Sequence, residues 1–237
     1  MTLKKSKITF KPKSNYEKFG QKLYFLLVEN FPHTYYVGGM VRNILLKRPI
    51  NDIDLVTDAP PGAVLELLGK HSIAANDSYR RFGVVTATYQ RKPVEIATFR
   101  NDLAGKGRYP KVTFTKSIRQ DSKRRDFTIN SLYLSQKKEK ILDFHNGLED
   151  LKKQTIKFVG DPEARVKQDP LRIVRALRLH FELGFNFSRP TLKAMQANFG
   201  LINTLTQKRL ARELDKVRAP RAKTKIKKII SQGAYLT

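Results

Sequence analysis

The first sixty residues combine one helical pattern with two short apolar runs. Ser14 suits the N-cap of a helix, and the apolar residues that follow it have the spacing of a helix that buries one face. Apolar runs then begin at Tyr35 and at Ile53, with a glycine pair and a short helical segment between them. This pattern predicts a helix packed beneath a sheet whose first elements are strand, glycine turn, helix and strand. The apolar positions of the first helix are Phe19, Leu23, Leu26 and Leu27.

The next ninety residues carry turn signals between short apolar segments. Consecutive prolines precede a helix that we expect at about residues 61–70. The segments 82–90 and 92–99 predict a β-hairpin. Residues 101–111, with two glycines and a proline, predict a loop, and the last apolar run of this part ends at Gly147.

Beyond Gly147 glycine becomes sparse and the periodicity becomes helical. Asp169 before Pro170 is typical of an N-cap followed by a first-turn proline, and Gly184 predicts the end of that helix. Further helices are expected at Arg189 to about Asn198 and at Leu205 to Val217.

These patterns predict an α+β fold with two domains. A mixed-sheet domain is expected at residues 15–147 and an all-α domain at residues 148–219. A mobile basic arm, residues 1–14, is expected before them, and a basic tail, residues 220–237, after them.

Composition and charge narrow the choice of partner. The 237 residues include 47 Lys and Arg against 21 Asp and Glu, so the net charge is +26. This excess predicts a polyanionic partner, and nucleic acid is favoured over a membrane because no basic amphipathic anchor is present. A generally basic composition is the alternative. The absence of cysteine excludes disulfides and thiolate chemistry, and the lack of a long apolar segment predicts a cytoplasmic location.

Two residue pairs in the first domain predict phosphate and metal chemistry. Gly38 and Gly39 allow close approach of the backbone to a triphosphate at the start of a helix, and Arg42 adds a charged fork one turn later. Asp52 and Asp54 are two residues apart, so on a strand both face the same side. Two such carboxylates repel unless a cation lies between them, and hard oxygen ligands favour Mg²⁺. Either pair alone is more often an ordinary turn or a solvated loop.

The order of these residues, GGMVRN followed by DIDLVT, resembles the catalytic motif of the polymerase-β-like nucleotidyltransferases. Within them it is similar to the tRNA nucleotidyltransferase (CCA-adding enzyme) and bacterial poly(A) polymerase family. The resemblance implies that Asp52 and Asp54 are catalytic metal ligands and that Glu95 is a third catalytic carboxylate. For Glu95 an ordinary place on the solvent face of its strand stays open. Asn43 departs from the family, which commonly has aspartate at that position.

The segment RRDFTIN resembles the family's second motif. This resemblance implies that Arg125 contacts the triphosphate and that Asp126 accepts from a ribose hydroxyl. A surface charge run before a core helix is the alternative. The segment DFHNG, residues 143–147, departs from the family pattern at the expected hinge.

Arginines recur every three residues in the helix after Pro170, at Arg172, Arg175 and Arg178. Like charges along one side of a helix are unfavourable, so we expect something anionic to lie along them. The segment QDPLRIVRALRL resembles the family's EDxxR motif, with Gln168 in place of the glutamate. This implies that Asp169 and Arg172 read the base of the incoming nucleotide, and that Arg175 and Arg178 are further nucleotide contacts. The later segment TQKRLARELDKV resembles the neck motif that buttresses this helix.

Together these likenesses imply a nucleotidyltransferase head followed by a helical neck. The implied activity is the template-independent transfer of CMP and AMP from CTP and ATP to the 3′ end of tRNA, with Mg²⁺ as cofactor. A narrower CC-adding, A-adding or poly(A) polymerase activity is one alternative. A non-catalytic RNA-binding module on the same scaffold is another, disfavoured by the intact aspartates. The resemblance covers roughly residues 20–217, and no protein partner is implied.

Overall fold

The computed structural model describes residues 8–102 and 112–232, which divide into two compact units. The described part of the first unit comprises residues 8–102, 112–125 and 129–147, and that of the second comprises residues 126–128 and 148–232. The chain therefore leaves the first unit at Asp126, returns to it at Ile129 and enters the second unit finally at Leu148.

A seven-stranded sheet forms the first unit, in the order β3-β4-β5-β2-β1-β8-β9. Its central neighbours β2 and β5 are parallel, and the other five pairings are antiparallel. The strands are β1 (Tyr35–Val37), β2 (Ile53–Thr57), β3 (Ala75–Asn76), β4 (Val84–Tyr89), β5 (Lys92–Thr98), β8 (Leu132–Ser135) and β9 (Lys140–Asp143), while β6 (Arg100–Asp102) and β7 (Val112–Phe114) form a separate ladder.

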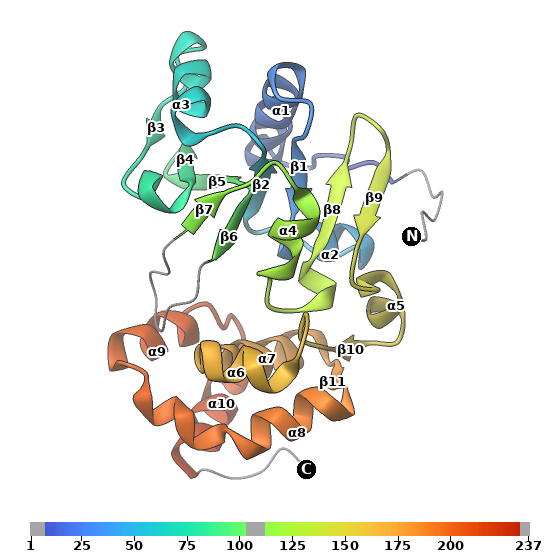
Figure 1. The fold of residues 1–237 in the computed structure, drawn as a ribbon, viewed down its shortest axis with the longest axis vertical. Coiled ribbons are helices and arrows are strands. Elements are labelled where there is room, and N and C mark those ends of the chain that lie inside the picture. Colours follow the sequence, from blue (N-terminus) through green and yellow to red (C-terminus); the bar gives the residue numbers. More distant parts are fainter. Residues whose placement is uncertain (1–7, 103–111, 233–237) are drawn as a thin grey trace. The chain divides into compact units, whose positions relative to one another are not determined.

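Helix α1 (Asn15–Asn30) packs on β1 and β2 of this sheet (Figure 1). Ser14 caps the helix by accepting the N–H of Glu17 at 3.2 Å, which confirms the predicted N-cap. Gly20 is needed where the helix meets β2, because a Cβ at this position would lie 2.4 Å from Cδ1 of Ile53. The backbone of α1 therefore approaches β2 more closely than a helix with a side chain there could.

The buried face of α1 differs in part from the predicted one. Leu23 and Leu27 are buried as expected, whereas Phe19 and Leu26 are only half-buried. The buried stripe of α1 is centred one residue away from the predicted apolar positions, because tyrosines and a glycine belong to it as well as aliphatic residues. Its members are Tyr16, Gly20, Leu23, Tyr24, Leu27 and Val28.

Residues 8–13 do not belong to a mobile arm, contrary to the prediction for residues 1–14. Phe10 is buried, and its ring meets that of Tyr36 edge-on with the centroids 5.5 Å apart. Its carbonyl accepts from the side chains of two glutamines. One apolar residue within a basic stretch thus anchors this segment, and residues 1–7 lie outside the described part.

Most local predictions for the first unit are confirmed. The predicted strand, glycine turn, helix and strand correspond to β1, Gly38, α2 (Gly39–Leu45) and β2. Helix α3 (Pro61–Lys70) and the β4–β5 hairpin, whose turn residues Gln90 and Arg91 have positive φ, lie where expected. Of the loop predicted at 101–111, the first two residues belong to β6 and the rest lie outside the described residues. The remaining elements are α4 (Ile118–Lys123) and the 3-10 turns Arg80–Phe82 and Thr128–Asn130.

The second unit is helical apart from one short ladder. Helix α7 (Leu171–Leu183) ends at Gly184, whose φ of 73° is left-handed, as the sequence predicts. Strands β10 (Thr155–Ile156) and β11 (Asn186–Phe187) pair in parallel, an addition to the predicted helices. The other helices are α5 (Gly147–Lys152), α6 (Pro162–Gln168), α8 (Arg189–Ala197), α9 (Gln207–Leu214) and α10 (Pro220–Gln232), with a 3-10 turn at Phe199–Thr204.

The predicted α+β class is confirmed by a mixed sheet in one unit and by helices in the other. The apolar periods of the sequence therefore specify both kinds of element. Within residues 8–102 and 112–232, none of the helices has the length and apolar character needed to cross a membrane.

Candidate functional site

Three carboxylates gather at the parallel strand pair of the first unit. The register of β2 and β5 makes Asp54 the direct neighbour of Glu95, so both side chains lie on one face of the sheet. Asp52 is exposed and immediately precedes β2. Burial is the main cause that raises the pKa of the Tyr16 hydroxyl, and the charges of all three carboxylates raise it further. The structure thus places two of the predicted catalytic acids side by side, with the exposed Glu95 beside Asp54, and Asp52 one residue before the strand.

The glycine turn between β1 and α2 lies against these carboxylates. Gly38 has a φ of +75°, and a Cβ on it would lie 3.2 Å from Oδ2 of Asp54. Gly39 is crowded in a similar way, since its Cβ would lie 3.3 Å from Nη2 of Arg42. The positive φ of Gly38 favours glycine at this position, and both glycines lie where turn, carboxylate and guanidinium meet closely.

Arg42 is a buried side chain with its donors directed at two amides. Its Nε and Nη2 donate to Oδ1 of Asn43 at 3.2 and 3.0 Å, and its Nη1 donates to Oδ1 of Asn130 at 2.6 Å. Asn43, where the chain departs from the family pattern, therefore orients the guanidinium. Contact of Arg42 with a phosphate stays a prediction.

The carboxylates suit a hard cation that keeps part of its water shell. In the described part of the chain, no group of three or more acidic, histidine or cysteine side chains is arranged to enclose a metal ion. Asp54 and Glu95 instead offer neighbouring oxygen ligands on an accessible face. Mg²⁺ is generally held in this manner, by one or two carboxylates together with waters and substrate phosphates. The residues therefore fit Mg²⁺ that binds with a triphosphate.

Arg125 belongs to a buried ion-pair network of the first unit. Its Nη2 donates to Asp121 at 3.1 Å and its Nε to the hydroxyl of Tyr133 at 2.8 Å. Arg124 and Tyr133 also donate to Asp121, each at 2.8 Å. Burial favours a raised pKa for Asp121, but the two arginines outweigh it and lower the pKa to about 2. The network joins α4 to β8, and a triphosphate contact for Arg125 stays a prediction.

Asp126 is paired with an arginine of its own unit, the second one. Its Oδ2 accepts from Nε and Nη2 of Arg175 at 2.8 and 2.5 Å, and its Oδ1 accepts the N–H of Phe127 at 2.8 Å. Burial acts to raise the pKa of Asp126, yet Arg175 and these hydrogen bonds hold it well below its usual range. The acid predicted to bind a ribose is thus paired with one of the predicted nucleotide-binding arginines.

The arginine row on α7 faces acids of the protein itself. Nε of Arg178 donates to Glu213 at 2.8 Å, and its Nη1 lies 3.3 Å from Glu182. Glu213, on α9, has a side chain only 3% exposed and also lies 3.8 Å from Arg175. The anionic groups expected along this row are therefore found within the chain, and nucleotide contacts of Arg175 and Arg178 stay predictions.

The base-reading candidates at the start of α7 are held by neighbouring helices. Pro170, and not Asp169 as predicted, occupies the N-cap position of α7, and Oδ1 of Asp169 accepts the N–H of Leu171 at 3.1 Å. Both carboxylate oxygens of Asp169 accept from Nη2 of Arg209 at 3.0 and 3.1 Å. Arg172 is buried, and its Nη1 donates to a carbonyl of α6 at 2.6 Å and to Oε1 of Gln168 at 2.8 Å. Gln168, which replaces the family's glutamate, therefore orients Arg172.

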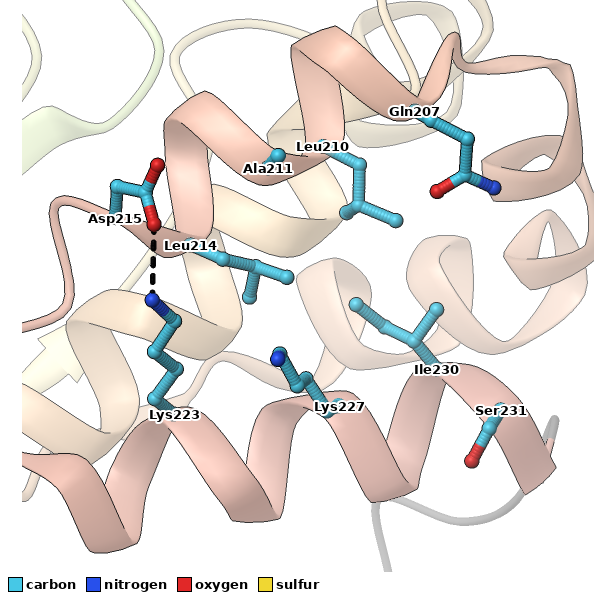
Figure 2. A pocket seen from close by; sticks show the side chains of 9 residues that line it. All are labelled: Gln207, Leu210, Ala211, Leu214, Asp215, Lys223, Lys227, Ile230 and Ser231. Atoms are coloured by element: carbon cyan, nitrogen blue, oxygen red, sulfur yellow. Dashed lines mark hydrogen bonds and ion pairs between the residues drawn. The ribbon is translucent and has the colours of Figure 1, made fainter.

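A groove of about 340 Å³ separates α9 from α10 in the second unit (Figure 2). Leu210, Leu214 and Ile230 point into it, while an ion pair between Asp215 and Lys223, at 2.9 Å, borders one end. None of the predicted site residues lines this groove. It is therefore separate from the site that the motifs define.

The poly A polymerase head domain family matches residues 34–157, which is more than half of the chain. The match includes the glycine turn, the three carboxylates and the RRDFTIN segment. The chain belongs to the poly A polymerase head domain family.

Members of this family with close sequences are CCA-adding enzymes. The chain is 40% identical over 185 residues to the CCA-adding enzyme of Lactobacillus helveticus, a match that covers 77% of this chain and 45% of the relative. The enzyme of Bacillus subtilis is 34% identical over 199 residues, covering 83% of this chain and 49% of the relative. The chain spans about half the length of the curated relatives it matches.

Solved structures give the same picture of the fold. A crystal structure of the Bacillus stearothermophilus CCA-adding enzyme in complex with CTP matches with a TM-score of 0.75 and 31% identity, over 86% of this chain and 49% of that one. A tRNA nucleotidyltransferase complexed with a primer tRNA and an incoming ATP analog matches with a TM-score of 0.68 and 27% identity, over 90% of this chain and 59% of that one.

In this member of the poly A polymerase head domain family, sequence reasoning missed three residues that touch the site. Arg209 and Glu213 lie four residues apart on α9 and hold Asp169 and the α7 arginines. Their signal was present, because an Arg and a Glu at that spacing share one helix face. No sequence pattern indicated Tyr16, since a tyrosine in the apolar stripe of a helix is typical of an ordinary core residue.

Proposed function

We propose that this chain transfers CMP and AMP from CTP and ATP to the 3′ end of tRNA without a nucleic-acid template. The observation that carries the proposal is the pairing of Asp54 with Glu95 on parallel strands, with the Gly38 turn against Asp54. The proposal is supported by relatives named CCA-adding enzymes and by the nucleotide and tRNA complexes of the matched structures.

The acids of the first unit are assigned to the chemical step. Asp52, Asp54 and Glu95 would hold Mg²⁺, since they offer only oxygen ligands on an accessible face. Mg²⁺ bound there supplies Lewis-acid stabilisation of the α-phosphate and lowers the pKa of the attacking hydroxyl. The 3′ oxygen of tRNA forms the new bond to the α-phosphorus, and pyrophosphate leaves from the opposite side. Gly38, Gly39 and Arg42 are assigned to orienting the triphosphate.

The second unit is assigned to the choice of nucleotide. A carboxylate accepts but cannot donate, so Asp169 suits the exocyclic amino groups of cytosine and adenine. Arg172, oriented by Gln168, supplies the complementary donors. The pairing of Asp169 with Arg209 keeps the carboxylate directed at the start of α7. Arg125, Asp126, Arg175 and Arg178 are assigned to the remaining nucleotide contacts.

The test uses tRNA that ends at the discriminator base, at C or at CC, each incubated with one labelled nucleoside triphosphate at a time. Full CCA addition predicts CMP incorporation on the first two substrates and AMP incorporation on the third. Labelling that stops at CC, or that occurs only on the third substrate, identifies the narrower activities. Repeated AMP addition identifies a poly(A) polymerase. Binding of tRNA without any incorporation identifies the non-catalytic alternative and overturns the proposal.

A further inference from the structure

Tyr16 of α1 links the two strands that carry the carboxylates. The tyrosine is buried, and its hydroxyl accepts the N–H of Ile53 at 3.1 Å and donates to the carbonyl of Pro93 at 2.7 Å. Ile53 lies between the two aspartates of the DxD motif, and Pro93 lies two residues before Glu95. One oxygen atom is therefore bonded to the backbones of both β2 and β5 beside the site.

The Tyr16 hydroxyl lies where the parallel pair of β2 and β5 would form its first backbone hydrogen bond. The register pairs Ile53 with Val94. In such a ladder the N–H of Ile53 is directed toward the carbonyl that precedes its partner, which is that of Pro93. The Tyr16 hydroxyl is bonded to both groups, so it sets the spacing of the strands where they begin.

The side chain is held firmly enough to act as a spacer. Gly20, one turn further along α1, permits close contact with β2 at Ile53. The ammonium group of Lys92 lies 5.5 Å from the centre of the Tyr16 ring. Burial, followed by the nearby carboxylate charges, raises the pKa of Tyr16 to about 12, so the hydroxyl remains a donor at assay pH.

We infer that Tyr16 is a positioning residue for the catalytic carboxylates, whose separation across β2 and β5 its hydroxyl sets. This role rests on the proposed function, because it concerns the acids assigned to Mg²⁺. Removing the oxygen leaves the Ile53 N–H and the Pro93 carbonyl without their shared partner. They satisfy each other by moving together, which shifts Glu95 relative to the two aspartates. Displacements of this kind matter, since about 1 Å of misplacement can cost roughly a hundredfold in rate.

The test compares Tyr16→Phe with Tyr24→Phe, a control from the same helix. Tyr24 is also buried, and its hydroxyl also accepts a backbone N–H, that of Lys137 at 3.1 Å, but near the β8–β9 turn. Each variant loses one oxygen and keeps its ring. Mn²⁺ affinity, measured by electron paramagnetic resonance in the presence of a non-hydrolysable CTP analogue, is combined with kcat and KM for CTP and with the melting temperature.

We expect the two variants to lose similar thermal stability while only Tyr16→Phe affects the site. Its Mn²⁺ affinity should fall several-fold and its kcat about tenfold, the rate factor of roughly one hydrogen bond, with KM for CTP within about twofold of wild type. Equal Mn²⁺ affinity and kcat in the two variants would show that Tyr16 has only a structural role. If wild type binds Mn²⁺ but adds no nucleotide, the proposed function fails, and the Mn²⁺ comparison still decides the role of Tyr16. Wild type that binds no Mn²⁺ overturns both.

Discussion

The acids at the candidate site of the first unit differ from the buried acids of the second unit. In the first unit Asp54 and Glu95 are neighbours of like charge on an accessible face, with exposed Asp52 beside them. In the second unit Glu213 has a side chain 3% exposed and contacts two arginines, and Asp126 is bonded twice to Arg175.

This difference separates acids on an accessible face from acids whose charge is already balanced by arginines of the protein. Like charges gathered in the open cost stability and become favourable when a cation binds. Acids buried against arginines cannot be removed without leaving an uncompensated charge. Substitutions should therefore abolish activity in the first group and destabilise the protein in the second.

The largest effect is expected for Asp54→Asn. Nucleotide addition should fall at least about a hundredfold, because a ligand to the charge that stabilises the transition state is weakened. The free energy of unfolding should change by about 1 kcal/mol or less, because Asp54 is only half-buried. Single-turnover incorporation and urea denaturation measure the two quantities. Asp77→Asn, the same change at an exposed aspartate, is the control, and equal activity in the two variants would exclude a catalytic role for Asp54.

Glu213→Gln should have the next largest effect, which is a lower free energy of unfolding. Breaking a buried pair costs about 3–5 kcal/mol, and a loss near the lower end of that range is expected because Arg178 keeps its contact with Glu182. Glu163→Gln removes an exposed pair with Lys167, at 2.6 Å, and should cost at most about 1 kcal/mol. Urea denaturation of both variants measures the difference. Similar losses would show that burial does not distinguish the two pairs.

The loss of unfolding free energy at acid pH should reveal the contribution of Asp121, a buried acid of the first unit. Its folded pKa of about 2 lies below its ordinary value of 3.8, so its contribution is present above pH 4 and is lost as the pH falls toward 2. The shift corresponds to about 2 kcal/mol. The stability difference between wild type and Asp121→Asn should therefore shrink by about that amount between pH 5 and pH 2. A constant difference would contradict the lowered pKa.

The smallest effect is expected from the surface lysines. Between residues 216 and 232 the chain has seven Lys and Arg and no acid, whereas Lys137 and Lys138 are followed by Glu139. Lys227→Gln with Lys228→Gln should lower the slope of log affinity for tRNA against log salt by about 1 to 2, at about 0.7–0.9 per phosphate contact. The matched pair Lys137→Gln with Lys138→Gln should leave the slope nearly unchanged. Equal slopes for both pairs would mean that α10 does not contact RNA.

Local features of the fold could be predicted from the sequence because they depend on neighbouring residues. The Ser14 cap, the Gly38 turn, helix α3 and the β4–β5 hairpin are examples. Phe10 was misjudged because a single apolar residue in a basic stretch gives no periodic signal, although it is buried.

The acids of the candidate site could be proposed from the sequence, but the residues that hold the site in place could not. Asp52 and Asp54 are two residues apart, which predicts a shared face on a strand, although β2 begins only at Ile53. The partners of the α7 arginines come from far along the chain: Arg178 bonds to Glu213, 35 residues away, and Arg175 to Asp126, 49 residues away. Such pairings follow from tertiary packing, which no local pattern specifies.

One measurement tests the division of labour between the two units most directly: single-turnover incorporation of each of the four nucleotides by wild type, Asp54→Asn and Asp169→Asn. Asp54→Asn should slow CTP and ATP alike and leave their preference over UTP and GTP unchanged. Asp169→Asn should keep the hydrogen bond from the N–H of Leu171, because an asparagine side-chain oxygen also accepts. It should lower that preference by about ten- to a hundredfold, the cost of one mispaired group. A changed preference in Asp54→Asn, or an unchanged one in Asp169→Asn, would contradict the assignment of catalysis to the first unit and selection to the second.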